Sequence, residues 1–137
     1  MPKPDQSVLD RKAQIVEALC KVLPSYSLIF DEHETRAYEC DGLTAYRCPP
    51  LVAVLPRTSQ ECAAAMRVCH DLNVTVVPRG AGTSLAGGAL PTADCVILGT
   101  ARLKDVLEVD YDNRIIRVQT GVTNLSVTRS EEHTRCL

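Results

Sequence analysis

The stretch Val76–Leu90, VVPRGAGTSLAGGAL, is the most informative part of this chain. Four of the chain's seven glycines lie within nine of its residues, and they directly follow a β-branched run. The stretch has one arginine, two hydroxyl side chains and no carboxylate. A backbone with so few side chains can approach a ligand closely, and its successive N–H groups can converge on an anion. We therefore expect a loop that binds phosphate or pyrophosphate.

A strand–helix–strand unit leads into this loop. The apolar run Leu51–Leu55 is typical of a strand that is buried on both faces. Thr58 and Glu61 have the spacing of a capping box, which opens a helix that Asn73 ends. A second strand follows over Val74–Val77. We expect the two strands to be parallel, because a right-handed crossover helix connects them.

The remaining elements are shorter. We expect a helix over 7–23 with Ser7 as its N-cap, a strand over 27–30, a helical turn over 31–38, a buried strand over 95–98, a helical turn over 103–106, a β-hairpin around the turn 111–113, and a last helix that Thr123 caps. Together these elements predict a small α+β domain, in which a βαβ unit and a hairpin form a small mixed sheet with helices.

Two familiar phosphate motifs do not fit the glycine-rich stretch. A dinucleotide fingerprint needs glycine at its first, third and sixth positions, but the sixth position counted from Gly80 is Leu85. A Walker A loop needs a Gly-Lys-Ser/Thr sequence, which is absent. One alternative is that the glycines serve only tight turns. The pairing of Arg79 with the hydroxyls of Thr83 and Ser84 favours an anion instead.

The composition excludes several classes of function. The 15 basic and 17 acidic side chains are interspersed, so no basic patch indicates a nucleic-acid partner. No apolar run is long enough to span a bilayer, and residues 1–7 lack the apolar core of a signal peptide, which favours a cytoplasmic location. The seven cysteines form no C-x-x-C pair, and His33 and His70 have no ligand partner in the sequence. We therefore expect no metal site and interpret the cysteines as small buried side chains.

Residues 78–89, PRGAGTSLAGGA, strongly resemble the pyrophosphate loop of FAD-linked oxidases with the vanillyl-alcohol-oxidase (PCMH) type of flavin domain. Within that family, the segment Tyr38–Arg47 followed by Pro50 resembles the FAD-binding large subunit of bacterial glycolate oxidase. Residues 115–127 also match in order and spacing, so that the resemblance covers about residues 7–128. It implies a flavin domain of two α+β subdomains with FAD held between them, of which this chain is the first.

The resemblance also implies which residues hold the cofactor. Backbone amides of the loop hold the FAD pyrophosphate in this family. The matching site residues are Pro78, Arg79, Gly80, Ala81, Gly82, Thr83, Ser84, Gly87 and Gly88. Some relatives attach FAD covalently through a histidine, and Thr83 stands at that position, so we expect noncovalent FAD. Tyr38, Asp41 and Arg47 are further candidates near the cofactor, with a turn and surface residues as the alternative interpretation.

The match divides the chain into three segments. Residues 1–50 hold the N-terminal helix and a connecting segment, residues 51–128 the N-terminal part of the FAD-binding domain, and residues 129–137 a tail. The tail, RSEEHTRCL, fits neither the family nor the preceding helical pattern, and one reading frame of a common sequencing adapter encodes its first six residues. We hypothesise that the tail is an artefact. The chain is then a truncated fragment without the second flavin-binding segment and the substrate domain.

The resemblance implies a function for the intact protein. We expect it to oxidise a 2-hydroxy acid of the glycolate type and to pass electrons from FAD to an iron–sulfur partner subunit, beside a second flavin subunit. It is expected in the cytoplasm or peripheral to the inner membrane within that complex, and the fragment alone is expected to be inactive. Two alternatives stay open: a free-standing module that binds phosphate or a nucleotide, and a fragment of a D-lactate dehydrogenase-like flavoenzyme.

Overall fold

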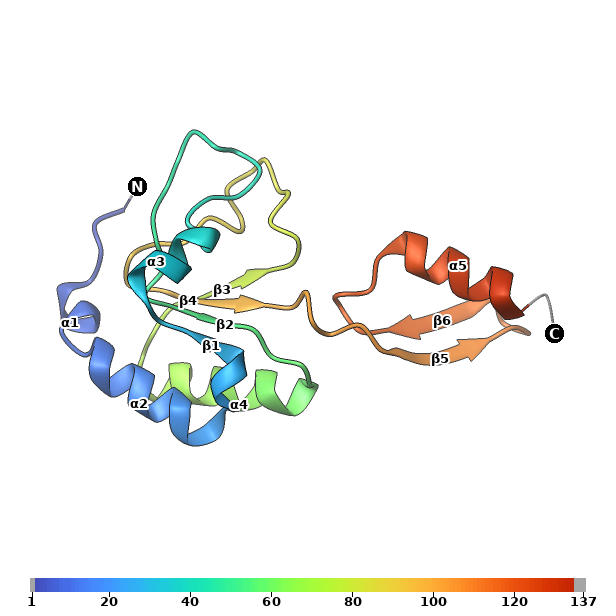
Figure 1. Ribbon diagram of the computed structural model, residues 1–137, viewed down its shortest axis with the longest axis horizontal. Helices are drawn as coiled ribbons and strands as arrows, with labels where there is room; N and C mark the ends of the chain where they lie inside the picture. Colours follow the sequence, from blue (N-terminus) through green and yellow to red (C-terminus); the bar gives the residue numbers. More distant parts are fainter. Residues whose placement is uncertain (1, 135–137) are drawn as a thin grey trace.

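A computed structural model of the chain describes residues 2–134, with side chains described as far as residue 129 (Figure 1). The helices are α1 (Gln6–Leu9), α2 (Lys12–Val22), α3 (Glu32–Thr35), α4 (Ser59–Asp71) and α5 (Asn124–Thr134), with 3₁₀ turns at Ser25–Ser27 and Arg36–Tyr38. The strands are β1 (Leu28–Ile29), β2 (Val52–Val54), β3 (Val76–Arg79), β4 (Val96–Gly99), β5 (Val106–Asp110) and β6 (Ile115–Val118). This arrangement confirms the mixed α+β fold.

A four-stranded sheet in the order β1-β2-β4-β3 forms the centre of the fold. Both β2 and β3 run parallel to β4, and β1 pairs with β2 in the antiparallel sense. The predicted β2–α4–β3 crossover is therefore present, with β4 inserted between its two strands. Every residue of β2 and β4 is buried, as their continuous apolar sequences predict.

Two layers cover this sheet. Helices α2 and α4 lie side by side on one face, where Figure 1 shows them below the strands. The core on this face includes Ile15 and Leu19 of α2, Ala65 and Cys69 of α4, and Val52, Val54, Val96 and Leu98 of the strands. The opposite face buries Ala53, Cys95 and Ile97 against Ile29, Tyr38 and Val77. Successive strand residues thus alternate between two cores.

Helix α4 begins as the capping-box spacing predicts, with one difference. The Thr58 hydroxyl accepts the N–H of Glu61 at 3.1 Å, which makes Thr58 the N-cap. The Glu61 carboxylate returns to the N–H of Arg57 at 2.8 Å, one residue before the cap. At the other end Asn73 adopts a positive φ of 51°, so it ends the helix as expected.

The expected single helix over residues 7–23 is wrong, because it breaks at Arg11. Asp5, and not Ser7, is the N-cap of α1, since its side chain accepts the Ser7 N–H. The Asp5 N–H itself donates to the Asp94 carboxylate at 2.7 Å. The Arg11 guanidinium donates to the carbonyl of Leu72 at 3.1 Å. These distant contacts fix where the helix starts and where it bends.

The helical turn expected over residues 103–106 is also wrong, since this segment is extended. The Gln119 N–H donates to the Asp105 carbonyl at 2.9 Å, and the Asp105 N–H donates to the Gln119 side chain at 2.9 Å. Leu103 is buried, and its carbonyl accepts the N–H of Gly121 at 2.8 Å. Cross-strand pairing therefore begins before β5 and replaces the local turn.

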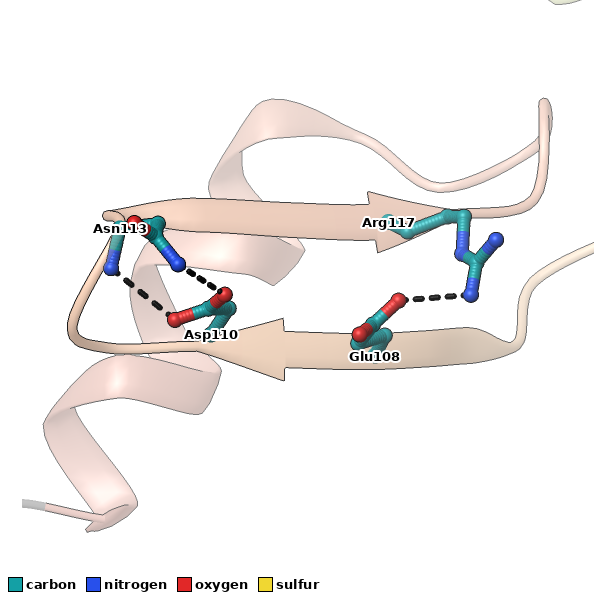
Figure 2. A network of polar contacts seen from close by, with 4 residues as sticks. All are labelled: Glu108, Asp110, Asn113 and Arg117. Carbon is teal, nitrogen blue, oxygen red and sulfur yellow. Dashed lines mark hydrogen bonds and ion pairs between the residues drawn. The ribbon is translucent and has the colours of Figure 1, made fainter.

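The predicted hairpin is confirmed as a separate two-stranded sheet of β5 and β6. Figure 2 shows its polar contacts: Arg117 pairs with Glu108 at 2.6 Å, and Asp110 accepts both the backbone N–H and the side-chain amide of Asn113. Thr123 accepts the Ser126 N–H and caps α5, as predicted. The helix continues to residue 134, and residues 135–137 of the predicted tail lie outside the described residues.

Candidate cofactor site

The glycine-rich loop leaves the carboxyl end of β3 and crosses to β4, its neighbour in the sheet. No helix starts within it, as its departure from the dinucleotide fingerprint predicts. Most of its side chains are exposed, and Leu85 is 73% exposed. Ala89 is buried, so the loop is anchored again before β4 begins. The loop therefore presents its backbone to the surface at the carboxyl edge of a parallel sheet, where α/β folds commonly bind ligands.

The glycines of the loop fall into two kinds. Gly82 and Gly87 have φ values of 72° and 76°, a left-handed conformation that L side chains rarely adopt. Gly80 and Gly88 have ordinary φ angles, and a Cβ added at either would meet no atom within 4 Å. The first two glycines are required by the turn itself. The backbone conformation does not require glycine at positions 80 and 88. Glycine at these two positions instead suits the close approach of a ligand to the backbone.

Most backbone N–H groups of the loop are free in the described part of the chain. Between Ala81 and Leu90 only two find an acceptor: the Ala86 N–H bonds to the Ser84 hydroxyl, and the Leu90 N–H bonds to the Gly87 carbonyl. Backbone donors are normally paired unless they face water or a ligand. A row of unpaired N–H groups in a glycine-rich turn is suited to binding an anion.

Gly42 orients two of these N–H groups. A Cβ at Gly42 would lie 2.8 Å from the Thr83 carbonyl oxygen and 2.9 Å from that of Ser84, so the two chain segments are in backbone contact. The C=O and N–H groups of a trans peptide point in opposite directions. The carbonyls of Thr83 and Ser84 face Gly42, and the N–H groups of Ser84 and Leu85 consequently point away from it. The residue types of this segment do not indicate this contact, because it joins backbone to backbone.

Arg79 joins the loop to the Tyr38–Arg47 segment. Its Nη1 donates to the Cys40 carbonyl at 2.7 Å and to the Ala89 carbonyl at 3.3 Å. The guanidinium also lies 5.8 Å from the centre of the Tyr38 ring, and it occupies the space that a Gly82 side chain would need. The structure thus gives Arg79 bonds inside the protein, behind the loop.

The family of FAD binding domains matches residues 50–135. The chain belongs to this family. Glycolate oxidase subunit GlcD of Escherichia coli K12 is 43% identical over 119 residues, which are 87% of this chain and 24% of the relative. GlcD of Bacillus subtilis is 34% identical, with 69% of this chain and 20% of the relative covered. D-2-hydroxyglutarate dehydrogenase of Bos taurus is 36% identical, with 76% and 19% covered.

Solved structures of the same fold come from more distant relatives. 4-Ethylphenol oxidase from Gulosibacter chungangensis superposes with a TM-score of 0.81 at 17% identity, covering 92% of this chain and 25% of that chain. p-Cresol methylhydroxylase superposes with a TM-score of 0.80 at 15% identity, covering 96% and 26%. The fold is therefore that of the PCMH-type FAD-binding domain, and the chain spans about a quarter of the length of these proteins.

The loop fits the FAD of an FAD-binding domain. The left-handed glycines, the free N–H groups and the absence of carboxylates in the loop suit the negative charge of a pyrophosphate. Of the three further candidates, Tyr38 lies under the guanidinium of Arg79. Asp41 precedes Gly42, which contacts the loop backbone. Arg47 instead forms an exposed ion pair with Glu39 at 3.1 Å.

Among the described residues, no three His, Cys, Asp or Glu side chains gather in a way that could hold a metal ion. Within the same residues, no helix is both long and apolar enough to cross a membrane.

Proposed function

We propose that this chain is the N-terminal part of a flavin-dependent oxidoreductase that oxidises a 2-hydroxy acid of the glycolate type. The observation that carries the proposal is the row of free N–H groups in the glycine loop of a chain that belongs to an FAD-binding family. Two glycolate oxidase subunits among the relatives, at 43% and 34% identity, support glycolate as the type of substrate. Activity, substrate and partners belong to a protein about four times as long as this chain.

The site residues have different roles in this proposal. Pro78 and Arg79 end β3 and place the loop, and the backbone of residues 80–84 with Gly87 and Gly88 holds the pyrophosphate. Thr83 occupies the position where some relatives carry a histidine linked to FAD, so the cofactor is bound noncovalently. FAD, when bound, accepts a hydride from the substrate. The residues of this chain bind and orient one end of it.

The wider assembly is part of the same proposal. The GlcD relatives are named as subunits of glycolate oxidase, which supports a multisubunit protein. We place an iron–sulfur subunit and a second flavin subunit beside the intact chain, in the cytoplasm or peripheral to the inner membrane. Co-purification of the full-length product with its subunits, followed by iron and flavin analysis, tests this assembly.

Titration of the chain with FAD, and separately with ADP, tests the cofactor site. Flavin fluorescence and thermal shift report binding. Gly80→Ala and Gly88→Ala are the sharpest variants, because the added methyl group meets no atom of the chain. We expect the melting temperatures to stay unchanged. The added methyl group should keep the pyrophosphate from a backbone N–H, and the affinity for FAD should fall about tenfold or more, because one hydrogen bond to a charged group contributes about 1.5–3 kcal/mol.

Two further variants provide a disruptive change in the loop and a control outside it. Gly82→Val forces a β-branched side chain into a left-handed conformation beside Arg79, so we expect it to abolish binding. Arg67→Ala removes an exposed arginine of α4 and serves as the control. Wild-type chain that binds neither FAD nor ADP would contradict the proposed site. Unaltered affinity in the Gly80 and Gly88 variants would show that the ligand lies elsewhere.

A second group of relatives supports one alternative substrate. D-Lactate dehydrogenase of Archaeoglobus fulgidus is 40% identical over 91 residues, 58% of this chain. Comparison of kcat/KM for glycolate and D-lactate, measured on the full-length product, distinguishes the two. A preference for D-lactate would replace glycolate in the proposal. Equal affinity of the chain for ADP and FAD, with no dehydrogenase activity in the full-length product, would favour a nucleotide-binding module.

A further inference from the structure

Asp41 carries a buried oxygen without a partner. The residue is 4% exposed, and its Oδ1 accepts the N–H of Leu43 at 2.9 Å. No donor among the described residues reaches its Oδ2, which is shielded from solvent. Burial of a carboxylate oxygen without a hydrogen bond is costly, so such a group in a folded chain needs an explanation.

The neighbours of Asp41 fix it against the glycine loop. The carbonyl of Cys40 accepts the Arg79 guanidinium, which lies behind the start of the loop. On the other side Gly42 is in backbone contact with Thr83 and Ser84. Asp41 thus lies between two contacts that join its segment to the loop. Asp41 therefore belongs to a segment that contacts Arg79 directly before it and the loop backbone directly after it.

The partner of this oxygen must be a donor. An ionised carboxylate only accepts hydrogen bonds, and its charge repels a phosphate, so the pyrophosphate itself is unsuitable. Thr83 and Ser84 supply the side-chain donors of the contacting segment. The Ser84 hydroxyl already accepts the Ala86 N–H at 3.3 Å. The Thr83 hydroxyl has no hydrogen-bond partner among the described residues, and it belongs to the residue whose carbonyl meets Gly42.

We propose that Asp41 is a positioning residue for the cofactor, whose Oδ2 accepts a hydrogen bond from the Thr83 hydroxyl when FAD binds. This bond fixes the Thr83–Ser84 backbone with its carbonyls toward Gly42. The N–H groups of Ser84 and Leu85 are then held toward the pyrophosphate. The inference rests on the proposed function, and it gives Thr83 a role inside the protein rather than a direct contact with FAD.

Asp41→Asn, Thr83→Val and the double variant test this bond in the full 137-residue chain. Asparagine keeps an oxygen for the Leu43 N–H and replaces the charged second acceptor by a neutral amide, which can bond to the Thr83 hydroxyl only as a donor and more weakly. We expect the melting temperature without ligand to stay unchanged or rise, because a buried carboxylate oxygen without a hydrogen bond is removed. The dissociation constant for FAD should rise about tenfold in Thr83→Val and by a smaller factor in Asp41→Asn. The double variant should bind no more weakly than Thr83→Val, because both changes act on the same bond.

Rescue and control variants complete the test. Thr83→Ser retains the hydroxyl and should bind FAD as the wild type does, and Asp71→Asn at the exposed end of α4 should leave both readouts unchanged. Wild-type affinity in Thr83→Val would overturn the inference while the proposed function stands. Additive losses in the double variant, or a fall in melting temperature parallel to the loss of affinity, would also overturn it. Absence of FAD binding to the wild-type chain would overturn both.

Discussion

The four-stranded sheet and the β5–β6 hairpin both contain large aliphatic side chains, but these differ in burial. Ile97 at the centre of the sheet is fully buried, whereas Leu107 and Ile115 of the hairpin are 56% and 59% exposed. The sheet has helices on one face and the Tyr38–Arg47 segment near the other, while the hairpin and α5 project from its end (Figure 1). Apolar side chains in a strand therefore do not by themselves show whether that strand is buried in the core of the described residues.

The largest expected effect contrasts one isoleucine from each region. Ile97→Ala removes a fully buried side chain and should lower the free energy of unfolding by about 2–5 kcal/mol. Ile115→Ala removes an exposed one and should cost about 0.5 kcal/mol or less. Urea denaturation followed by circular dichroism measures both. Equal losses would mean that the hairpin is buried in solution and that the contrast is wrong.

The junction between the two regions gives the next effect. A Cβ at Gly121 would lie 2.5 Å from the Thr100 carbonyl oxygen and 2.7 Å from that of Leu103. Gly121→Ala should therefore destabilise the chain by about 1–3 kcal/mol through overpacking, seen as a lower melting temperature. Gly88→Ala, which meets no atom, is the matched control. If the two variants melt alike, the end of the hairpin is not held against the exit from β4.

Helix caps provide a smaller contrast. Thr58→Ala removes the 3.1 Å cap of α4, a helix packed in the core, and should cost about 1 kcal/mol. Thr123→Ala removes the 3.3 Å cap of α5 in the projecting region, and about half of that loss is expected. Thermal unfolding of the two variants under one buffer condition compares them. A larger loss at Thr123 would show that α5 contributes more to the fold than its exposure indicates.

The smallest expected effect is a difference in the reactivity of two cysteine thiols. Burial raises the pKa of Cys69 to about 11, whereas Cys20 is exposed, so the interpretation of the cysteines as buried side chains is wrong for Cys20. The folded-state pKa lies above the unfolded value of about 8.5, so any stability from this group is present below pH 8.5 and is lost as the pH rises toward 11. At pH 8 with an aromatic disulfide reagent, Cys20→Ser should remove a rapidly reacting thiol. Cys69→Ser should leave the rapid phase unchanged, and a loss of that phase would show that Cys69 is accessible.

Elements with a complete local signal were predictable from the sequence. The strands β2 and β4 are continuous apolar runs, and α4 has its cap at Thr58 and its stop at Asn73. The errors occur where a distant partner decides the conformation. Asp94 and Leu72 fix the break between α1 and α2, and Gln119 keeps Asp105 extended.

The candidate site follows the same rule. The glycine-rich sequence predicts the loop, and the structure shows that Gly82 and Gly87 adopt a positive φ within it. The backing by Gly42 and the bond from Arg79 to Cys40 involve backbone carbonyls, which every residue type has. No side-chain pattern can indicate such contacts over a separation of 39 residues. The assignment of the loop residues to the FAD pyrophosphate stays a prediction until binding is measured.

The strand order β1-β2-β4-β3 has a consequence for the energetics of binding. The central strand β4 is the last of the four to be synthesised, and neither β2 nor β3 has a parallel partner before it is in place. The glycine loop is the connection that delivers this strand from the edge to the centre of the sheet. A ligand that binds only the folded state raises the free energy of unfolding of every element that unfolds with its site. Occupation of the loop is therefore expected to slow hydrogen exchange across the whole sheet.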